Sequence, residues 1–394
     1  MSNELPLGYQ YSAVYAGIRK TNKDDLSLIV SQPAANAAAV FTQNLVAAAP
    51  VVLSRANLKT SRGKVKALII NAGNANCSTR TGMKVAESTM KAAAKHARCT
   101  AAEVLPSSTG VIGVELDPKK ITSALPELFA GLSSERFGDV ARAILTTDLV
   151  MKTARATVLL KKGKVHIAGM TKGSGMIQPN MATTLGYVMC DAAISVKDLK
   201  VILASATNVS YNRLSVDGDT STNDTVVLLA NGASGIKPNP DELKQIADAI
   251  TGVMKSLAAQ IARDGEGAKK LIRVLVSGAK TEADAVLIGR AISNSPLVKT
   301  AIAGSDPNWG RIICAAGYSG AKFDPAKIDI FLQGKRVCKA GLAAPFDEAK
   351  LKLKLDGKDV VIDLRIAGNG KGATEFWTCD FTEGYIEING SYRT

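Results

Sequence analysis

Short apolar runs recur along the chain, and longer stretches that mix apolar and polar residues separate them. Eight of these runs have the length and the aliphatic, partly β-branched composition of strands. They are residues 27–31, 67–71, 156–160, 185–190, 226–230, 271–276, 327–332 and 359–365. The pattern therefore predicts a core rich in strands.

The clearest helix is expected over residues 240–263, where apolar residues recur every three or four positions. Asn239 stands where a capping residue is needed at its start. An Ala- and Lys-rich helix is expected over 82–98, and Ser195 and Thr281 each open a further capped helix. Strands and helices are thus predicted along most of the chain.

The chain has 394 residues, which is enough for one large domain or two to three smaller ones. Its hydrophobic content of 46% suits a large globular core. No apolar run reaches the roughly 18 residues of a membrane span, and the N-terminus has neither a signal-peptide nor a transit-peptide pattern. The six cysteines are scattered singly, as reduced thiols usually are, so we expect a cytoplasmic protein.

The formal net charge of +14 raises the question of a nucleic-acid partner. The basic residues are dispersed, and no aromatic residues are interleaved with the densest groups. The group at 350–358 alternates with apolar residues as the solvated face of a strand does. We therefore expect neither nucleic-acid binding nor membrane binding.

Only two histidines are present, and no cysteine lies near either of them at metal-ligand spacing. His96 falls in the Ala/Lys helix and His166 in an expected strand, where structural or surface roles are the simpler interpretation. The sequence therefore predicts no metal site and weakly favours an enzyme whose base is not histidine.

The stretch 171–191 carries the most specific chemistry. It begins with the glycine loop Gly173–Ser174–Gly175, reaches Ala182–Thr183, and then becomes apolar. A self-cleaving peptide bond needs such a loop, because a β-hydroxyl must bend back onto the preceding carbonyl. Cleavage would leave Thr183 with a free α-amine beside its own hydroxyl, which joins a nucleophile and its base in one residue. On spacing alone, a plain glycine loop before a strand is the alternative.

The strings 172–177 and 179–183 resemble the self-processing motif of the ornithine acetyltransferase family of arginine biosynthesis, also called glutamate N-acetyltransferase. Gln178 and Thr184 depart from the residues more often expected there, but neither change touches the chemistry. Further strings that are similar to this family, and in its order, are residues 38–44, 71–77, 107–113, 215–225, 305–311 and 384–394. The resemblance extends from about residue 12 to 394.

The resemblance implies a reaction centre. Thr183 would be the nucleophile, and Thr109 with Gly110 would form the oxyanion hole. A Thr-Gly pair can present a hydroxyl and a backbone amide to one oxygen, although a simple β-turn explains the same pattern. The cleavage site would lie between Ala182 and Thr183.

The resemblance also implies substrate-binding residues. A threonine contacts substrate in the family, and Thr147 is the better match, with Thr146 adjacent. Lys172 would be a fixed cation for a carboxylate. Glu266, between two glycines at the end of the long helix, would suit an amino group, and the alternative is a surface acid after a helix cap. Asn389 and Thr394 would contact substrate from a C-terminal strand that stops abruptly.

The fold implied is α/β (α+β): a layered α/β/β/α sandwich with a smaller C-terminal α/β subdomain over about 280–394. Self-cleavage would give an α chain, 1–182, and a β chain, 183–394, which associate as an α2β2 heterotetramer. The enzyme would transfer the acetyl group of N2-acetylornithine to glutamate by a ping-pong mechanism, without a metal or prosthetic group. Whether acetyl-CoA also serves as a donor stays open, because no residue discriminates the two cases.

Other interpretations remain. A self-processing aminopeptidase or amidase of the same fold would show the same motifs, and a basic binding protein without activity would account for the charge. A calcium loop at 215–225 is rejected. The loop lacks a glutamate at its twelfth position and leads into a strand, so we expect a polar loop around the site.

Overall fold

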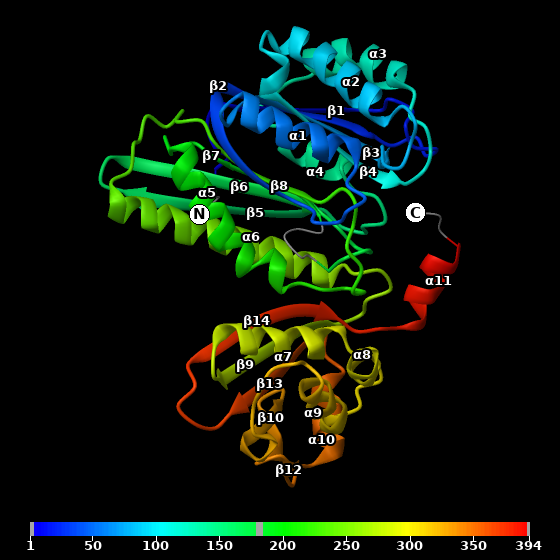
Figure 1. Ribbon diagram of the computed structural model, residues 1–394, viewed down its shortest axis with the longest axis vertical. Helices are drawn as coiled ribbons and strands as arrows, with labels where there is room; N and C mark the ends of the chain where they lie inside the picture. The colour runs from blue at the N-terminus through cyan, green and yellow to red at the C-terminus, as the bar shows by residue number, and fades with distance from the viewer. Residues whose placement is uncertain (1–3, 179–183, 392–394) are drawn as a thin grey trace.

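The computed structural model describes residues 4–178 and 184–391, and its strands form two sheets (Figure 1). The larger sheet has eight strands, in the order β4-β3-β2-β8-β7-β6-β5, with β1 paired to β2. These strands are β1 (Tyr9–Val14), β2 (Leu26–Phe41), β3 (Lys64–Asn74), β4 (Val104–Val111), β5 (Lys152–Leu160), β6 (Gly163–Lys172), β7 (Leu185–Cys190) and β8 (Thr225–Ala230).

The long strand β2 divides this sheet into two layers. Its first half pairs with β3, and its second half, from Asn36 to Phe41, pairs with β8. Side chains alternate between the faces of a strand. On β7, Leu185, Tyr187 and Met189 point into a core shared with β1 to β3, and Val188 points the other way. The two halves of the sheet therefore pack face to face around a buried apolar layer.

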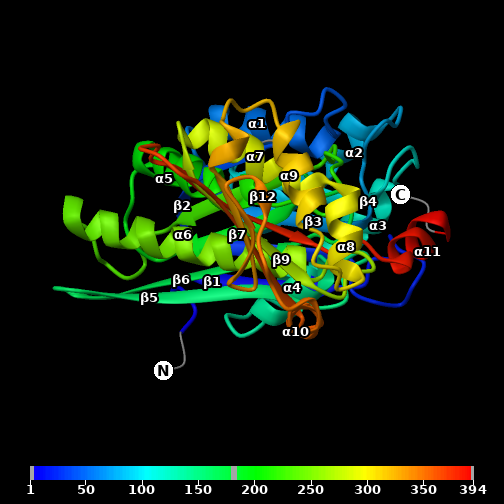
Figure 2. The same ribbon diagram turned by 90° about the horizontal axis from the view of Figure 1, so that it is seen from below.

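Helices cover both outer faces of these layers. The first face packs against α1 (Ala49–Thr60), α2 (Gly82–Ala97) and α3 (Pro118–Ala130). The second packs against α5 (Val196–Asn208) and α6 (Pro240–Arg263), which lies along β5 and β6 (Figure 2). A shorter helix, α4 (Phe137–Ala143), packs on β1. The predicted α/β/β/α sandwich is confirmed.

The second sheet has six strands in the order β12-β11-β10-β13-β9-β14, and it lies below the sandwich in Figure 1. Its strands are β9 (Leu271–Ala279), β10 (Ile328–Leu332), β11 (Lys335–Lys339), β12 (Leu342–Ala343), β13 (Asp359–Ile366) and β14 (Gly372–Cys379). One apolar core joins the sheet to α7 (Glu282–Asn294), α8 (Pro296–Ala303), α9 (Trp309–Gly317) and α10 (Glu348–Leu355). The second sheet begins with β9 at Leu271, so the subdomain boundary expected near 280 would leave this strand out.

Two expected strands are helices. The Lys-rich group at 350–358 lies largely in α10, because Leu351 and Leu355, four residues apart, share one buried face, while Leu353 is exposed. The C-terminal stretch forms α11 (Glu383–Ser391). A helical turn places Tyr385 and Asn389 one above the other, and the Asn389 amide donates to the Tyr385 carbonyl oxygen at 3.0 Å.

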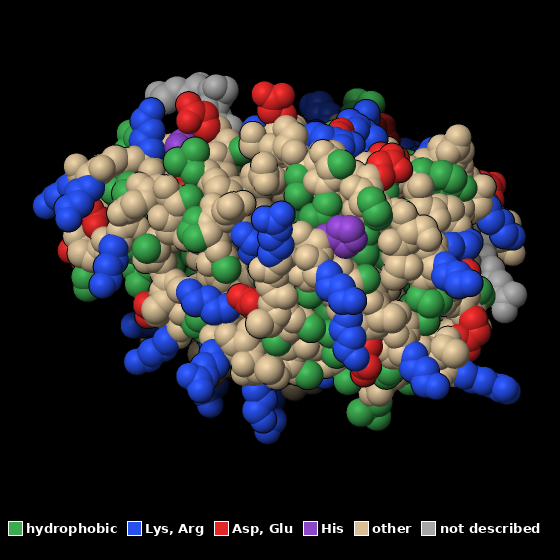
Figure 3. Space-filling model, turned by 90° about the horizontal axis from the view of Figure 1, so that it is seen from above, with side chains coloured by type: hydrophobic (Ala, Val, Ile, Leu, Met, Phe, Trp, Pro, Cys, Tyr) green, Lys and Arg blue, Asp and Glu red, His purple; other side chains and the backbone are tan. Residues whose placement is uncertain are grey.

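The remaining expected elements are present, with longer bounds for several strands. Asn239 and Glu242 form the expected capping box at the start of α6. Among the described residues, no helix has the length and apolar character needed to cross a membrane. On the face shown in Figure 3, Lys and Arg side chains are spread singly and in small groups, with Asp and Glu among them.

Candidate active site

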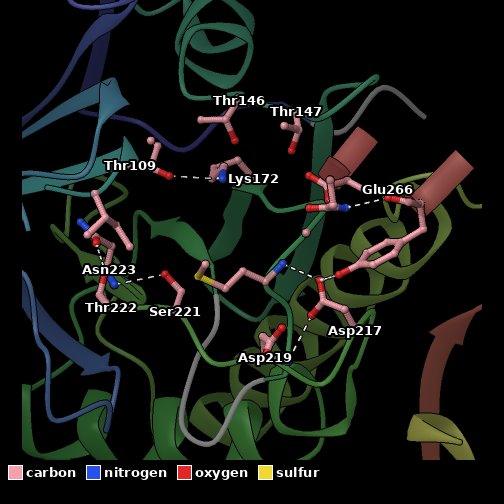
Figure 4. A pocket seen from close by; sticks show the side chains of 16 residues that line it. Thr109, Thr146, Thr147, Lys172, Asp217, Asp219, Ser221, Thr222, Asn223 and Glu266 are labelled. Carbon is pink, nitrogen blue, oxygen red and sulfur yellow. Dashed lines mark hydrogen bonds between the residues drawn. The ribbon is translucent and has the colours of Figure 1, made fainter. Parts of the chain in front are cut away.

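A cleft of about 220 Å³ opens where several strand ends of the sandwich meet α11. Every described residue of the predicted site lines it: Thr109, Gly110, Thr147, Lys172, Glu266 and Asn389 (Figure 4). Thr146 lines it as well. The proposed nucleophile Thr183, its neighbour Ala182, and Thr394 lie outside the described residues. The structure thus brings together side chains that are up to 280 residues apart in the sequence, from Thr109 to Asn389.

One side of the cleft combines a lysine with a Thr-Gly strand end. Lys172 ends β6, and its Nζ donates to Thr109 Oγ1 at 3.3 Å. Burial lowers the pKa of Lys172, and the nearby carboxylate of Asp148 opposes that shift. The side-chain nitrogen of Lys172 therefore lies directly beside the hydroxyl of the predicted oxyanion hole.

Gly110 can only be a glycine here. Its φ is +129°, and a Cβ atom would lie 2.3 Å from the carbonyl carbon of Gly73 on the paired strand. Gly73 has φ +120°, and a Cβ atom there would lie 3.0 Å from the Cβ of Arg19. The end of β3 thus makes a tight backbone contact with the end of β4.

The opposite side of the cleft is acidic. Glu266 is buried, and its Oε2 accepts from Asn389 Nδ2 at 2.8 Å. A Cβ atom on Gly175 would lie 2.2 Å from Glu266 Oε2, so the second glycine of the central loop makes room for this carboxylate. Glu266 is therefore a buried acid that points into the site, and not a surface residue after the helix.

Sequence reasoning missed Asp217 as a site residue, although it lies in the polar loop 215–225. Its carboxylate accepts from the backbone amides of Met176, at 2.6 Å, and Ile177, at 2.8 Å. The hydroxyl of Tyr385 donates to the same carboxylate at 3.4 Å. Asp217 thus links the central loop to α11, and Asp219, Ser221, Thr222 and Asn223 from the same loop complete the wall.

A buried ion triad lies beneath the cleft. Lys152 is fully buried, and its Nζ contacts Asp148 Oδ1 at 2.7 Å and Asp264 Oδ2 at 2.5 Å. Asp148 also accepts from the backbone amides of Gly173, at 2.7 Å, and Thr146, at 3.0 Å. The only sequence signal for the triad was the spacing of Asp148 and Lys152 after the threonine pair.

The triad connects three segments that carry predicted site residues. Asp148 holds the start of the segment with Thr146 and Thr147 and the start of the glycine loop after Lys172. Asp264 lies two residues before Glu266, and its backbone oxygen accepts from Ser174 Oγ at 2.6 Å. Burial alone would raise the pKa of Asp148, but the charges of Lys172 and Lys152 outweigh it and lower the pKa to about 2.

Asp224 is a further buried carboxyl that the sequence did not single out. Its exposed fraction is 2%, and its Oδ2 has no hydrogen-bond partner within the described part of the chain. Burial raises its pKa well above the ordinary value. Asp224 lines a small cavity with Lys172, Thr109 and Thr184, and the next residue, Thr225, donates its amide to Thr184 O at 2.8 Å.

Neither histidine lines the cleft. His166 contacts Thr157 Oγ1 at 3.2 Å on β5, and His96 stacks on Phe129. Within residues 4–178 and 184–391, no group of three or more His, Cys, Asp or Glu side chains is placed to hold a metal ion. The candidate chemistry of the described cleft is therefore that of hydroxyls, a lysine, amides and carboxylates.

Comparison with known proteins identifies the family of this chain. The model of the ArgJ family matches residues 10–394. The chain belongs to the ArgJ family. The family resemblance found in the sequence is therefore confirmed over nearly the whole chain.

Relatives in the ArgJ family cover both chains almost end to end. The arginine biosynthesis bifunctional protein ArgJ of Chlorobaculum tepidum is 44% identical over 391 residues, which are 99% of this chain and 96% of that protein. The protein of the same name from Nitratidesulfovibrio vulgaris is 43% identical over 391 residues, 99% of each chain. The interpretation as a binding protein without activity is therefore set aside in favour of an enzyme.

A solved ArgJ structure from Bacillus halodurans is also similar. It is 41% identical, with a TM-score of 0.50, and the match covers 51% of this chain and 96% of that chain. The layered α/β architecture of this chain is thus that of a solved ArgJ protein over the matched part.

Proposed function

We propose that this ArgJ-family chain transfers the acetyl group of N2-acetylornithine to glutamate by a ping-pong mechanism, through an acetyl-Thr183 intermediate. The observation that carries the proposal is the single cleft lined by a lysine, a Thr-Gly strand end and a buried carboxylate. Thr184, which directly follows the proposed nucleophile, lines an adjoining cavity with Thr109 and Lys172.

The charges of the cleft suit an acetylated diamino acid. Lys172 is a cation for the α-carboxylate, and Glu266 is an anion for the side-chain ammonium of ornithine. Thr147, Asn389 and Thr394 would supply further polar contacts. Donor and acceptor both carry an α-carboxylate and an α-nitrogen. Because the cleft is small, it would hold them one after the other.

Self-cleavage would generate the nucleophile. The Thr183 hydroxyl attacks the carbonyl carbon of Ala182, the peptide C–N bond breaks, and the nitrogen gains the proton that the hydroxyl loses. Water then hydrolyses the ester, which leaves chains 1–182 and 183–394. The solved Bacillus halodurans chain, matched over 96% of its length by about half of this chain, supports this step, since a cleaved product would have about that length.

Acetyl transfer would then use two displacement steps. The free α-amine of Thr183, with an ordinary pKa of about 7.7–8.0, takes the hydroxyl proton as the oxygen attacks the acetyl carbon. The Thr109 hydroxyl and the Gly110 amide would stabilise the oxyanion. The α-nitrogen of ornithine leaves with that proton, and the α-amine of glutamate attacks the acetyl ester to give N-acetylglutamate.

The proposal includes the association of the two chains into an α2β2 heterotetramer in the cytoplasm, with no resident cofactor. It also includes acetyl-CoA as a second acetyl donor. The word bifunctional in the names of the relatives supports a second activity. Glutamate would accept the acetyl group in both cases.

Mass spectrometry of the purified protein tests the mechanism at its first step. We expect two fragments, 1–182 and 183–394, for the wild type and for Thr183→Ser, and one intact chain for Thr183→Ala. N-acetylornithine labelled in the acetyl group is then assayed with and without glutamate. Labelled N-acetylglutamate is expected, whereas free acetate formed without glutamate would indicate an aminopeptidase or amidase. A wild-type chain that transfers acetyl groups while still intact would overturn the mechanism.

A further inference from the structure

Another cavity, of about 570 Å³, shares no lining residue with the cleft. Its floor is the second half of β2, from Ala37 to Phe41, which pairs with β8. One wall is α1 together with the turn that follows this helix, and the other wall is α5. We call this cavity the α1–α5 groove.

The spacing of residues along the two helices determines which side chains face the groove. Those of α1 lie three or four positions apart, as one face of a helix requires, and the turn continues the series: Arg55, Leu58, Lys59 and Arg62. Those of α5 follow the same rule: Val196, Lys200 and Leu203. Each helix therefore brings positive charge and apolar surface to the groove together.

The charge of the groove has one sign. Its charged lining residues are exposed cations, and within the described part of the chain no acidic residue lines it: Arg55, Lys59, Arg62 and Lys200. The apolar floor between these cations is not fully covered, because Ala39 and Val40 are only half-buried. Uncovered apolar surface surrounded by cations favours the binding of an organic anion.

The turn after α1 closes one end of the groove. Gly63 has φ +79°, and a Cβ atom there would lie 2.8 Å from Val196 Cγ1, so a glycine allows the turn to reach α5. Arg62, just before it, also has a left-handed backbone, with φ +54°. This conformation costs an arginine more than it would cost a glycine. The arginine at this position is therefore consistent with a use for its charge.

Arg55 connects the groove to the wall of the cleft. Its guanidinium lies 5.4 Å from the centroid of the Phe41 ring and donates to the backbone oxygen of Thr42. Thr42 is buried, and it donates from its amide to the Asp224 oxygen at 2.9 Å and from its hydroxyl to the Ser221 oxygen at 2.7 Å. Ser221 lines the cleft. A ligand that competes for Arg55 would therefore act on the loop that forms the cleft wall.

We propose that the α1–α5 groove is a regulatory binding site for an organic anion, in which phosphate or carboxylate groups are attached to an apolar or aromatic body. The anionic groups would meet the four cations, and the body would cover the apolar floor. Because a guanidinium binds a charged acceptor more strongly than a carbonyl oxygen, the anion would draw Arg55 away from Thr42. Occupation of the groove would loosen residues 221–224 and weaken substrate binding in the cleft, and substrate would weaken anion binding by the same factor.

Calorimetric titration of the wild-type protein tests the binding site. ATP carries phosphates on an aromatic base, trimesate carries carboxylates on a benzene ring, and inorganic pyrophosphate has no such body. We expect one site per protomer for ATP or for trimesate, which distinguishes phosphate from carboxylate as the anionic group. Pyrophosphate should bind about tenfold more weakly, because it lacks the apolar contact. If neither organic anion binds at millimolar concentration, the proposal is overturned.

Two substitutions on opposite walls locate the site. Lys200→Glu reverses a charge on α5, and Arg62→Gly removes a charge at a backbone position that glycine adopts without strain. Each should raise the Kd of the anion about tenfold at low salt and less at high salt, with little change in Tm. Lys352→Glu, an exposed charge reversal on α10, is the matched control and should leave the Kd unchanged. If Lys200→Glu and Arg62→Gly both keep the wild-type Kd, the groove is not the site.

Arg55→Met tests the connection to the cleft, and only this step rests on the proposed acetyl transfer. The substitution removes the hydrogen bond to Thr42, so it should raise the KM for N-acetylornithine about twofold to tenfold without any anion. The anion should raise the KM of the wild type by a similar factor and that of Arg55→Met no further. An anion that binds in the groove but leaves the wild-type KM unchanged would overturn the regulatory role. Because the titrations need no activity, a protein that transfers no acetyl group would overturn the proposed function and still test the groove.

Discussion

The residues beneath the cleft and the core of the second sheet are both buried, but one is charged and the other is apolar. Beneath the cleft, Lys152, Asp148 and Asp264 form an ion triad whose side chains are 0%, 0% and 6% exposed. In the second sheet, Ile330 and its neighbours on β9, β13 and α7 form an apolar core. Buried charge is costly to desolvate, whereas apolar burial is itself the main stabilising contribution to folding.

The two regions contribute to the protein in different ways. No described residue between 271 and 379 lines the cleft, so the apolar core of the second sheet can be judged by stability alone. The Asp148 carboxylate of the triad holds the segments of Thr146 and Lys172 at defined positions, which an apolar side chain could not do. The segment of Glu266 is joined to the glycine loop through the backbone oxygen of Asp264. A substitution that removes a charge of the triad should therefore lower activity far more than an equally destabilising substitution in the second sheet.

The largest effect is expected for Lys152→Met. Two buried carboxylates would lose their shared cation, at a cost of about 3–5 kcal/mol in the free energy of unfolding. In the wild type, the pKa of Asp148 is lowered to about 2 from 3.8. The stabilisation is thus complete above pH 3.8 and is lost as pH falls toward 2. Urea unfolding as a function of pH, with kcat and KM for N-acetylornithine, measures both consequences.

The matched control for the triad is Lys244→Met, which breaks an exposed pair with Asp248 on α6. Its stability and activity should equal those of the wild type within error, because exposed ion pairs contribute little. If Lys152→Met retained wild-type kcat and KM in the folded protein, the triad would be a structural feature without a positioning role.

The second prediction tests the apolar region. Ile330→Ala removes a fully buried side chain from β10 and should lower the free energy of unfolding by about 3 kcal/mol. Activity per folded molecule should stay within about twofold of wild type, since the core does not reach the cleft. Calorimetry and single-turnover assays on the same sample would show the contrast with Lys152→Met, and a large loss of kcat would contradict it.

The sequence predicted the apolar elements better than the charged contacts around the site. Apolar periodicity located β7 at 185–190, β8 near 226–230 and the whole of α6, because burial of an apolar face dictates those elements. It was wrong at α10 and α11, where a few aliphatic residues fit either period. One of these aliphatic residues, Ile386 of α11, is 67% exposed and so does not belong to the core.

The described site residues named from the family motifs all line the cleft, but the residues that hold them were largely missed. Asp217 acts through backbone amides, and Lys152 acts through two carboxylates that are 116 residues apart, from Asp148 to Asp264. Of these contacts, only that between Asp148 and Lys152, which are four residues apart, follows a local spacing. The other contacts depend on how distant loops meet, so periodicity cannot predict them.

A third prediction concerns the carboxylate of Glu266, the proposed partner of the substrate ammonium group. Glu266→Gln keeps the shape and a possible contact with Asn389 but removes the anion. The KM for N-acetylornithine should rise about tenfold to a hundredfold, because a hydrogen bond to a charged group contributes about 1.5–3 kcal/mol. The free energy of unfolding should not fall. Steady-state kinetics with each substrate varied would measure the effect, and an unchanged KM would exclude Glu266 as the ammonium partner.

The smallest change in the free energy of unfolding is expected for Asp224→Asn, and this substitution should stabilise the protein. Burial raises the pKa of Asp224 well above 3.8, so the folded state binds this proton more tightly than the unfolded state does. Full stability is therefore present below pH 3.8 and declines as pH rises through the raised pKa. Asparagine, which carries no charge, should stabilise the protein by about 1 kcal/mol at neutral pH.

The gain from Asp224→Asn should shrink toward pH 3.8, where the wild-type carboxyl is protonated in both states. Thermal unfolding of both proteins across this pH range measures the trend. A gain in stability accompanied by slower chain cleavage or slower acetyl transfer would show that this buried carboxyl is kept for chemistry at the expense of folding. A variant that is less stable than wild type at neutral pH would mean that the carboxylate is ionised and paired, and would place Asp224 with the triad instead.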